Sequence, residues 1–384
     1  AGFWPFYSAD FHLSPPTLTE IDPAFAAIWI IGIACALGAA YQAKYHRLAA
    51  LILMGGAGLV TCITFVWLSA PDLALTQLLV EIVTTVLILL GLRWLPKRIE
   101  RIDNYNTLIG RIRRYRDFLL AVACGGGMAM IAYIMMSSPL SATIASYFLE
   151  QAYPKGGGTN VVNVILVDFR GFDTFGEITV LGIVALTIFA LLRRFRPAPD
   201  SIEIPEQQRM QNAYDDASAN REIGETVRDY LWVPSVIMQW MFPFIILLAA
   251  YLFLRGHDLP GGGFAAGITM AIGFLLLYIA GGTRWMEDRL YILPMLWIGF
   301  GLILAVFTGI GSWLFGFPFL TSYFHYMEIP LVGKVPIATA LLFDLGVFAL
   351  VIGATALILI ALAHQSIRSH RTRTIEITKM EEDT

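Results

Sequence analysis

The stretch SAPDLALTQLLVEIVTTVLILLGL, residues 69–92, is an apolar run with one carboxylate, Glu81, near its middle. An α-helix needs about 20 mostly apolar residues to cross the hydrocarbon core of a bilayer, and this run is long enough. A carboxylate at bilayer depth costs roughly 2.5 to 3.5 kcal/mol on insertion scales. The rest of the chain must therefore give Glu81 either a partner or a function.

The composition predicts an all-α integral membrane protein. Of the 384 residues 57% are apolar and only 14% are charged, and the mean hydropathy is +0.67. A soluble domain carries about 25% charged residues. We predict nine membrane-spanning helices, at residues 24–41, 48–70, 73–92, 118–136, 172–192, 231–254, 261–282, 290–315 and 336–363.

The basic residues predict the orientation of these helices. With the amino terminus outside and the carboxyl terminus in the cytoplasm, 22 of the 26 Lys and Arg residues fall in cytoplasmic segments. Only Lys155, Arg170, Arg255 and Lys334 fall outside. This alternation follows the positive-inside rule, and an error in the number of helices would have destroyed it.

The polarity of the segments between the helices predicts two modules. Residues 195–230 are rich in charge, Asn, Gln and Pro, which is typical of a cytoplasmic linker. We expect a five-helix module at 1–194, a four-helix module at 231–366 and a cytoplasmic tail at 367–384.

A long outer loop, residues 137–171, interrupts the first module. It contains a short amphipathic helix candidate at Leu140–Ala152 and an apolar run, Val161–Val167, that is too short to span a bilayer. We expect the run to pack on the outer surface or to re-enter against other helices. Loops of this length usually serve a purpose, so we expect it to dock a partner or a neighbouring helix.

Several classes of site are not indicated. Cys35, Cys62 and Cys124 all lie in predicted spans without a CxxC motif, so we expect no metal site, cofactor or disulfide framework. The net charge of −3 gives no indication of a nucleic-acid partner, and we expect none. The first 23 residues lack the basic region of a signal peptide. The chain begins with Ala rather than Met, which suggests that it is a piece of a longer protein.

Glu81 belongs to a polar stripe on its predicted helix. Gln77, Thr84 and Thr85 lie at positions i−4, i+3 and i+4 from it, so all four share one face. One interpretation is a hydrogen-bonded carboxyl group that holds helices together. The other is a relay for protons or cations, because a buried carboxyl group that water reaches can exchange protons near neutral pH. Asp72 is better explained as an acid at the start of the helix.

A second pair of acids lies in GFDTFGEITV, residues 171–180. Asp173 and Glu177 are four residues apart, which would place two carboxylates on one face at the outer mouth of the fifth span. Thr174 followed by Glu177 also fits a capping box, so the pair has a structural explanation as well.

The stretch RGHDLPGGGFAAG, residues 255–267, matches neither a Walker loop nor a dinucleotide-binding fingerprint. Asp258 is placed to cap a helix that Pro260 begins, and the glycines allow another backbone to approach closely. His257, beside Asp258, is a candidate for proton exchange, although a lone surface histidine is more often structural. Asp344 lies eight residues after Pro336, about 12 Å into the ninth span at 1.5 Å per residue.

Three strings carry a resemblance to a known family. They are PDLALTQLLVEIVTTVLILLGLRWLPKR at 71–98, NVILVDFRGFDTFGEITVLGIVAL at 163–186, and RGHDLPGGGFAAGITMAIGFLLLYIAGG at 255–282. With these strings the chain resembles the carboxyl-terminal part of the large A-type polypeptide of Mrp-type (Mnh, Pha) multisubunit Na+/H+ antiporters, fused to the B-type polypeptide. The first string is also similar to the J subunit of respiratory complex I.

The resemblance implies a subunit of a transporter in the bacterial inner membrane, not an enzyme. Glu81 would match the acid of the J-like third helix, and Glu177 the acid of GFDTFGE. The family exchanges cytoplasmic Na+ for external H+, and its partners are the other subunits of the complex, including antiporter-like modules, besides membrane lipid. Nothing here represents the large antiporter-like module of a full A-type polypeptide, so this chain alone should not transport. A component of a redox-driven pump, as in membrane-bound hydrogenase or complex I, and a structural scaffold are the alternatives.

Overall fold

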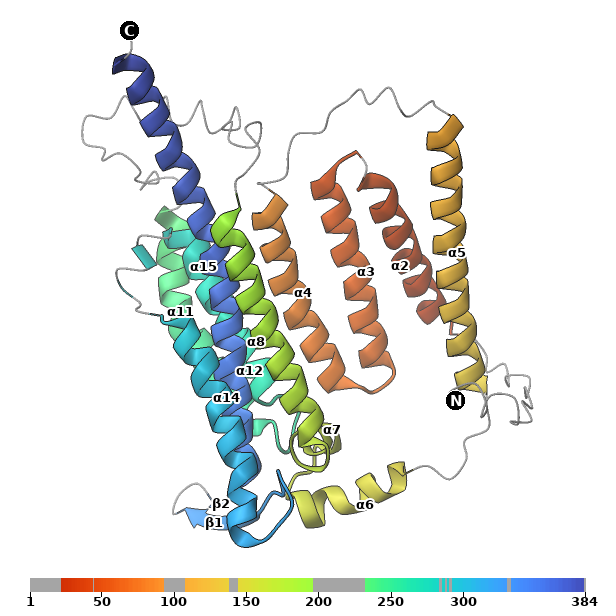
Figure 1. Ribbon diagram of the computed structural model, residues 1–384. Helices are drawn as coiled ribbons and strands as arrows, with labels where there is room; N and C mark the ends of the chain where they lie inside the picture. Colours follow the sequence, from red (N-terminus) through yellow and green to blue (C-terminus); the bar gives the residue numbers. More distant parts are fainter. Residues whose placement is uncertain are drawn as a thin grey trace. The chain divides into compact units, whose positions relative to one another are not determined.

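Long apolar helices make up most of the computed structural model (Figure 1). The structure describes residues 22–43, 45–92, 108–137, 144–195, 232–282, 285–286, 289, 292–329 and 333–382. Within these ranges nine helices are long and apolar enough to cross a membrane, and each overlaps one predicted span. The prediction of a mainly helical protein with about nine membrane-spanning helices is therefore confirmed for the described residues, which also contain one short β-hairpin.

The nine helices are bounded close to where the apolar runs begin and end. They are α2 (Pro23–Gln42), α3 (Arg47–Trp67), α4 (Pro71–Leu92), α5 (Leu108–Ser137), α8 (Gly171–Arg194), α11 (Trp232–Arg255), α12 (Gly263–Gly281), α14 (Pro294–Gly311) and α15 (Thr339–Glu382). Helix α5 belongs to a separate compact unit of the chain, which comprises residues 1–26 and 97–146. It begins ten residues before the predicted span, because the basic segment ahead of the apolar run is helical too.

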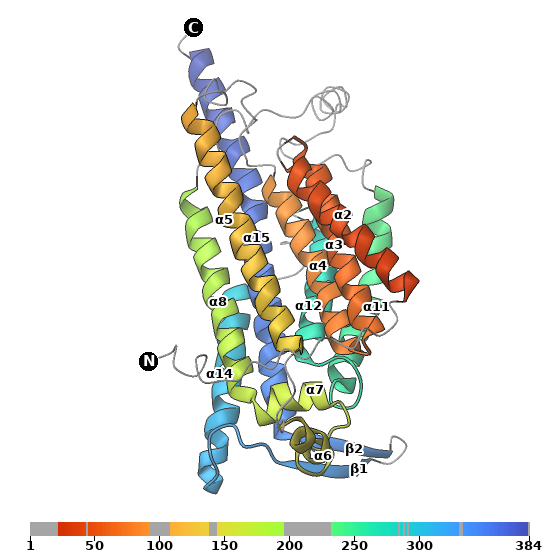
Figure 2. The same ribbon diagram turned by 90° about the vertical axis from the view of Figure 1, so that its right-hand side faces the viewer.

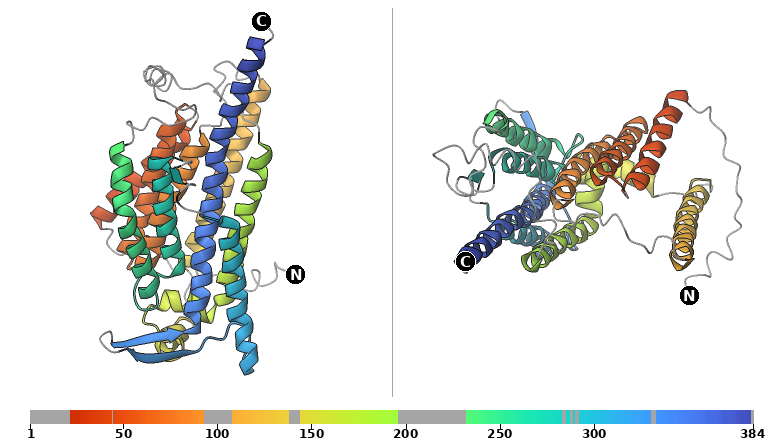
Figure 3. Two further views of the ribbon diagram at one scale, coloured as in Figure 1. Left: turned by 90° about the vertical axis from the view of Figure 1, so that its left-hand side faces the viewer. Right: turned by 90° about the horizontal axis from the view of Figure 1, so that it is seen from above.

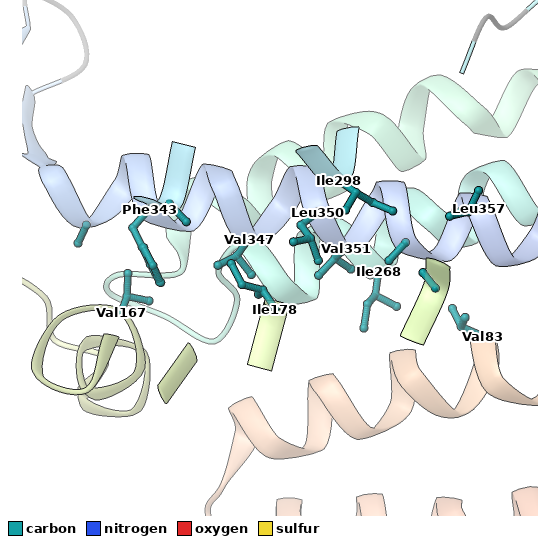
Figure 4. Close-up of a cluster of buried hydrophobic side chains, with 14 of the residues drawn as sticks. Val83, Val167, Ile178, Ile268, Ile298, Phe343, Val347, Leu350, Val351 and Leu357 are labelled. Atoms are coloured by element: carbon teal, nitrogen blue, oxygen red, sulfur yellow. The ribbon is translucent and has the colours of Figure 1, made fainter. Parts of the chain in front are cut away.

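Helices α12 and α15 are the most buried of the nine. Helix α15 packs against α14, α12, α8 and α4, and α12 also packs against α11 and α4; Figure 3 shows α4 beside α12 and α15. Phe343, Val347 and Leu350 of α15 form a buried cluster with Ile268 of α12 and Ile178 of α8 (Figure 4). The first predicted module thus shares its core with the second through α4 and α8.

The backbones of α14 and α15 approach each other closely at two glycines. A Cβ atom at Gly301 would lie 2.5 Å from the carbonyl oxygen of Gly346 and 2.8 Å from Cβ of Leu350. A Cβ atom at Gly346 would in turn lie 2.8 Å from the carbonyl oxygen of Gly301. The neighbouring Gly299 has open space where its side chain would be. Small residues at such a crossing let membrane helices pack backbone to backbone.

Replacing Gly301 by valine is expected to separate α14 from α15. Overpacking of a tight contact typically costs about 1–3 kcal/mol, so the thermal midpoint of the detergent-solubilised protein should fall. Gly299→Val is the matched control, because it changes the same helix by the same atoms and should leave the midpoint close to that of the unmodified protein. Equal midpoints for the two variants would contradict this packing.

Several short elements gather at one end of the bundle. They are α6 (Ala145–Gly156), α7 (Val161–Val164), the π-helical turn η2 (Ile165–Phe169), the 3-10 turn η3 (Ser312–Phe315), and strands β1 (Phe324–Ile329) and β2 (Gly333–Ala338). The strands form an antiparallel hairpin at the same end of the bundle as α6 and α7 (Figure 2). Val164 and Val167 are buried, so the apolar run packs against other helices as expected.

Both predicted boundaries of the ninth span differ from the structure: the helix begins later than predicted and ends later as well. Pro336 pairs with Tyr326 in the hairpin instead of beginning the ninth span, since a two-stranded hairpin has only edge strands, which tolerate proline. Helix α15 begins at Thr339, so Asp344 lies about 7.5 Å into the helix and not 12 Å. The helix also continues through most of the predicted tail. Apart from Phe195, the predicted linker 195–230 lies outside the described residues.

Candidate functional site

The loop between α11 and α12, residues 256–262, is tied to the segment between α6 and α7. The side-chain amide of Asn160 donates hydrogen bonds to the carbonyl oxygens of Gly256 and Leu259, both at 3.1 Å. The backbone N–H of Asn160 donates to the carbonyl oxygen of His257 at 3.0 Å. Asn160 is buried, so these bonds form away from water. Two parts of the chain about 100 residues apart thus form one polar structure, which we call the glycine-loop junction (residues 156–160 and 256–263).

Two carboxylates from other helices reach this junction. Oδ1 of Asp72, in the first turn of α4, accepts the backbone N–H of Gly261 at 3.1 Å. Oδ2 of Asp344, in α15, accepts the backbone N–H of Gly263 at 2.7 Å. Asp344 is only 6% exposed, and Gly263 is the first residue of α12. The N–H groups and the dipole at a helix N-terminus stabilise a negative charge, so α12 compensates the buried Asp344 carboxylate.

His257 and Asp258 hold the other side of the junction. The carboxylate of Asp258 accepts the backbone N–H of Thr159 at 3.2 Å. The predicted cap by Asp258 is wrong, because α12 begins at Gly263, three residues beyond Pro260. Nε2 of His257 lies 2.8 Å from the carbonyl oxygen of Gly156. A carbonyl oxygen only accepts, so Nε2 carries the proton in this contact.

Asp168, in the π-helical turn η2, lies next to the junction. The sequence does not predict it as a site residue. Burial raises the pKa of its carboxyl group above the ordinary 3.8, while a hydrogen bond from Ser322 and the charge of His257 oppose that rise. Because the folded-state pKa is the higher one, protonation of Asp168 favours the fold. The contribution of protonated Asp168 to the free energy of unfolding is complete below pH 3.8 and is lost as the pH rises through the raised pKa.

Glu81 lies apart from the junction, on the face of α4 that packs against α3. Nε2 of Gln77 donates to Oε2 of Glu81 at 3.4 Å, as their spacing of four residues predicts. The carboxylate lies over Gly55 and Gly58 of α3. Glu81 and Thr85 are partly buried and Thr84 is exposed. The contact between Gln77 and Glu81 is present, and the function of the stripe stays a prediction.

Asp173 and Glu177 lie on an exposed face of α8. Asp173 forms an ion pair with Arg170. The capping-box explanation is wrong, because α8 begins at Gly171 and Thr174 donates instead to the carbonyl oxygen of Leu166, at 2.7 Å. The two carboxylates share one exposed face, on a helix whose other sides pack in the core. An exposed acid on a spanning helix is costly in lipid, so this face is suited to contact with protein.

The structure therefore separates the predicted site residues into groups. His257, Asp258 and Asp344 meet at the junction, Gln77 and Glu81 meet against α3, and Asp173 and Glu177 share the exposed face of α8. Among the described residues, His, Cys, Asp and Glu form no group of three that could hold a metal ion. Asp72 and Asn160 also belong to the junction, although the sequence predicts only a helix start at Asp72 and a loop at Asn160.

A bundle of membrane-spanning helices with acidic residues inside the spans is typical of ion-transporter components. Comparisons with known proteins agree. Family models for the MBH proteins MbhD and MbhE, and one described as "Domain related to MnhB subunit of Na+/H+ antiporter", match residues 31–97, 112–209 and 233–357. The chain belongs to the Mrp-type family of multisubunit antiporter proteins, and it joins a region similar to part of the A-type polypeptide to a region similar to the B-type polypeptide.

Individual relatives show how much of each protein is covered. The probable K(+)/H(+) antiporter A/B polypeptide of Rhizobium meliloti (strain 1021) is 67% identical over 374 residues, which is 97% of this chain and 37% of that protein. The B-type polypeptide of the Na(+)/H(+) antiporter of Bacillus subtilis (strain 168) is 44% identical over 115 residues, 30% of this chain and 80% of that protein. The chain thus spans little more than a third of its A/B relative.

A solved structure is similar to most of this chain. The Mrp complex from Dietzia sp. DQ12-45-1b contains a chain that is similar with a TM-score of 0.74 and 27% sequence identity. The similarity covers 90% of this chain and 35% of that one. The bundle therefore has the fold of a segment of one polypeptide in an Mrp complex.

Proposed function

We propose that the chain is part of a multisubunit antiporter in the bacterial inner membrane that exchanges cytoplasmic monovalent cations, in the first place Na+, for external H+. The observation that carries the proposal is the 67% identity over 97% of the chain to an A/B polypeptide that is named for antiport. The distribution of Lys and Arg supports an orientation with the amino terminus outside. The junction end of the bundle would then face outward.

The acids of the spanning helices support a place in the path of the ions. Among the residues that the structure describes, Gln77 donates a side-chain hydrogen bond to Glu81 at the long distance of 3.4 Å, and Glu81 is only partly buried. A carboxylate in a spanning helix is expensive unless it faces protein or water, where it can bind and release cations or protons. Binding and release at Glu81 would break few hydrogen bonds. Asp344, in contrast, is held by the backbone N–H of Gly263 at the N-terminus of α12.

The A/B relative favours K+ as a second candidate for the cation. Its name specifies K(+)/H(+) exchange, and it is far more similar to this chain than the relatives named for Na(+)/H(+) exchange. A monovalent cation that binds a carboxylate is distinguished by size and hydration, not by charge, so both ions suit the same acids. The assay must therefore supply each ion separately.

The decisive experiment uses everted vesicles from a host without its own Na+/H+ and K+/H+ antiporters. With all subunits of the complex present, addition of Na+ or K+ should dissipate a respiration-generated pH gradient, as reported by a pH-sensitive dye. Omission of this chain should abolish the response, and this chain expressed alone should give none. Full exchange by a complex that lacks the chain would contradict the proposal, as would an assembled complex that responds to neither ion.

A further inference from the structure

Helix α3 provides space for the Glu81 carboxylate at one glycine. A Cβ atom at Gly58 would lie 2.5 Å from Cδ of Glu81 and 2.9 Å from its Oε1, and closer still to Oε2. A Cβ atom essentially never comes within 3.0 Å of a heavy atom of another, non-neighbouring residue, so no other residue could stand at Gly58 with Glu81 in its present position. The carboxylate thus occupies the space that the missing side chain leaves.

At the neighbouring glycines of α3, an added Cβ atom would not collide with the Glu81 carboxylate. A Cβ atom at Gly55 would lie 3.8 Å from Oε1 of Glu81, which is an ordinary van der Waals contact. A Cβ atom at Gly56 would meet Sγ of Cys35, in α2, at 3.1 Å. Of these three glycines, only Gly58 determines where the carboxylate can lie.

An added methyl group at Gly58 would move the carboxylate more readily than the helices. The atoms it would meet are the far end of a flexible side chain, with rotatable bonds between them and the backbone of α4. Moving those atoms requires a change of rotamer, and it also disturbs the 3.4 Å contact from Nε2 of Gln77. Alanine is in addition a better helix former than glycine, by roughly 0.8–1.0 kcal/mol. The substitution should therefore leave the helix pair folded.

We propose that Gly58 is a positioning residue for Glu81. Because Gly58 has no side chain, the Glu81 carboxylate can lie against α3 at this point, which is its position in the ion path. The inference rests on the proposed function, in which Glu81 exchanges cations or protons. A displacement of about 1 Å at a reacting group can cost about 100-fold in rate, so a small shift of the carboxylate is sufficient to impair exchange. No change in the amount of complex is needed for that effect.

The test is Gly58→Ala in the complete complex, with Gly55→Ala as the matched control. Gly58→Ala should reach the normal amount of complex, lower the rate of exchange by about 10- to 100-fold and change the cation concentration that gives half-maximal exchange. Gly55→Ala should keep both values within about twofold, because it makes only an ordinary contact. A Gly58→Ala complex with normal rate and normal half-maximal concentration would overturn the proposal.

A shorter acid provides the complementary test. Aspartate at position 81 draws the carboxylate back by one methylene group, away from the methyl group added at Gly58. The double variant Gly58→Ala/Glu81→Asp should therefore exchange faster than Gly58→Ala alone. If Gly58→Ala fails to assemble, recovery of assembly in the double variant supports the same contact. Failure of the double variant to recover either property would overturn the proposal and make Gly58 a helix-packing residue.

Glu81→Gln separates this inference from the proposed function. If Glu81→Gln abolishes exchange while Gly58→Ala has no effect, Glu81 is in the path and only the positioning by Gly58 is wrong. If both variants exchange normally in an assembled complex, the function proposed for Glu81 has failed as well.

Discussion

Replacing Asp344 by leucine is expected to lower the amount of assembled complex, and the rate of exchange with it. Asp344 is buried, and its carboxylate accepts the backbone N–H of Gly263 at the start of α12. Leucine would leave that buried N–H without an acceptor, at a cost of about 1–3 kcal/mol.

The matched control for this prediction is Asp344→Asn. Asparagine keeps an oxygen that can accept from Gly263 but removes the charge, so it should assemble better than the leucine variant. The amount of complex extracted in mild detergent and the cation-dependent dissipation of the pH gradient measure the two effects separately. Normal assembly and normal exchange by Asp344→Leu would show that the contact with Gly263 stabilises nothing.

The spanning helices could be predicted because each is a continuous apolar run whose length matches the bilayer. Their ends could not all be predicted, because helical structure does not stop where apolar sequence stops. The basic residues before α5 and the polar tail after α15 continue helices that composition alone would end. Pro336 suggested a helix start, but strand pairing with Tyr326 placed it in a hairpin.

Contacts within one helix could be predicted, and contacts between distant segments could not. The pair Gln77 and Glu81 follows from a spacing of four residues. Asp344 and Gly263 are 81 residues apart, and Asp72 and Gly261 are 189 residues apart. No local pattern distinguishes an acid that begins its own helix from one that also binds another loop, which is why the sequence predicts only a helix start at Asp72.

Replacing Glu81 by glutamine is expected to have the largest effect on exchange with the smallest effect on structure. Glutamine has nearly the same shape, so the fit over Gly58 and the proximity to Gln77 can persist. It cannot bind and release a proton or compensate a cation. Removing a group that transfers protons typically costs about 10²- to 10⁴-fold in rate, so exchange should fall to background.

The most direct measurement compares Glu81→Gln with the unmodified chain in everted vesicles that contain equal amounts of complex. Dissipation of the pH gradient is recorded on addition of Na+ and, separately, of K+. The proposal that Glu81 belongs to the ion path predicts no response to either ion from the variant and a clear response from the unmodified complex. A normal response from Glu81→Gln would contradict it, and Glu81 would then be a hydrogen-bonded carboxyl group that serves helix packing alone.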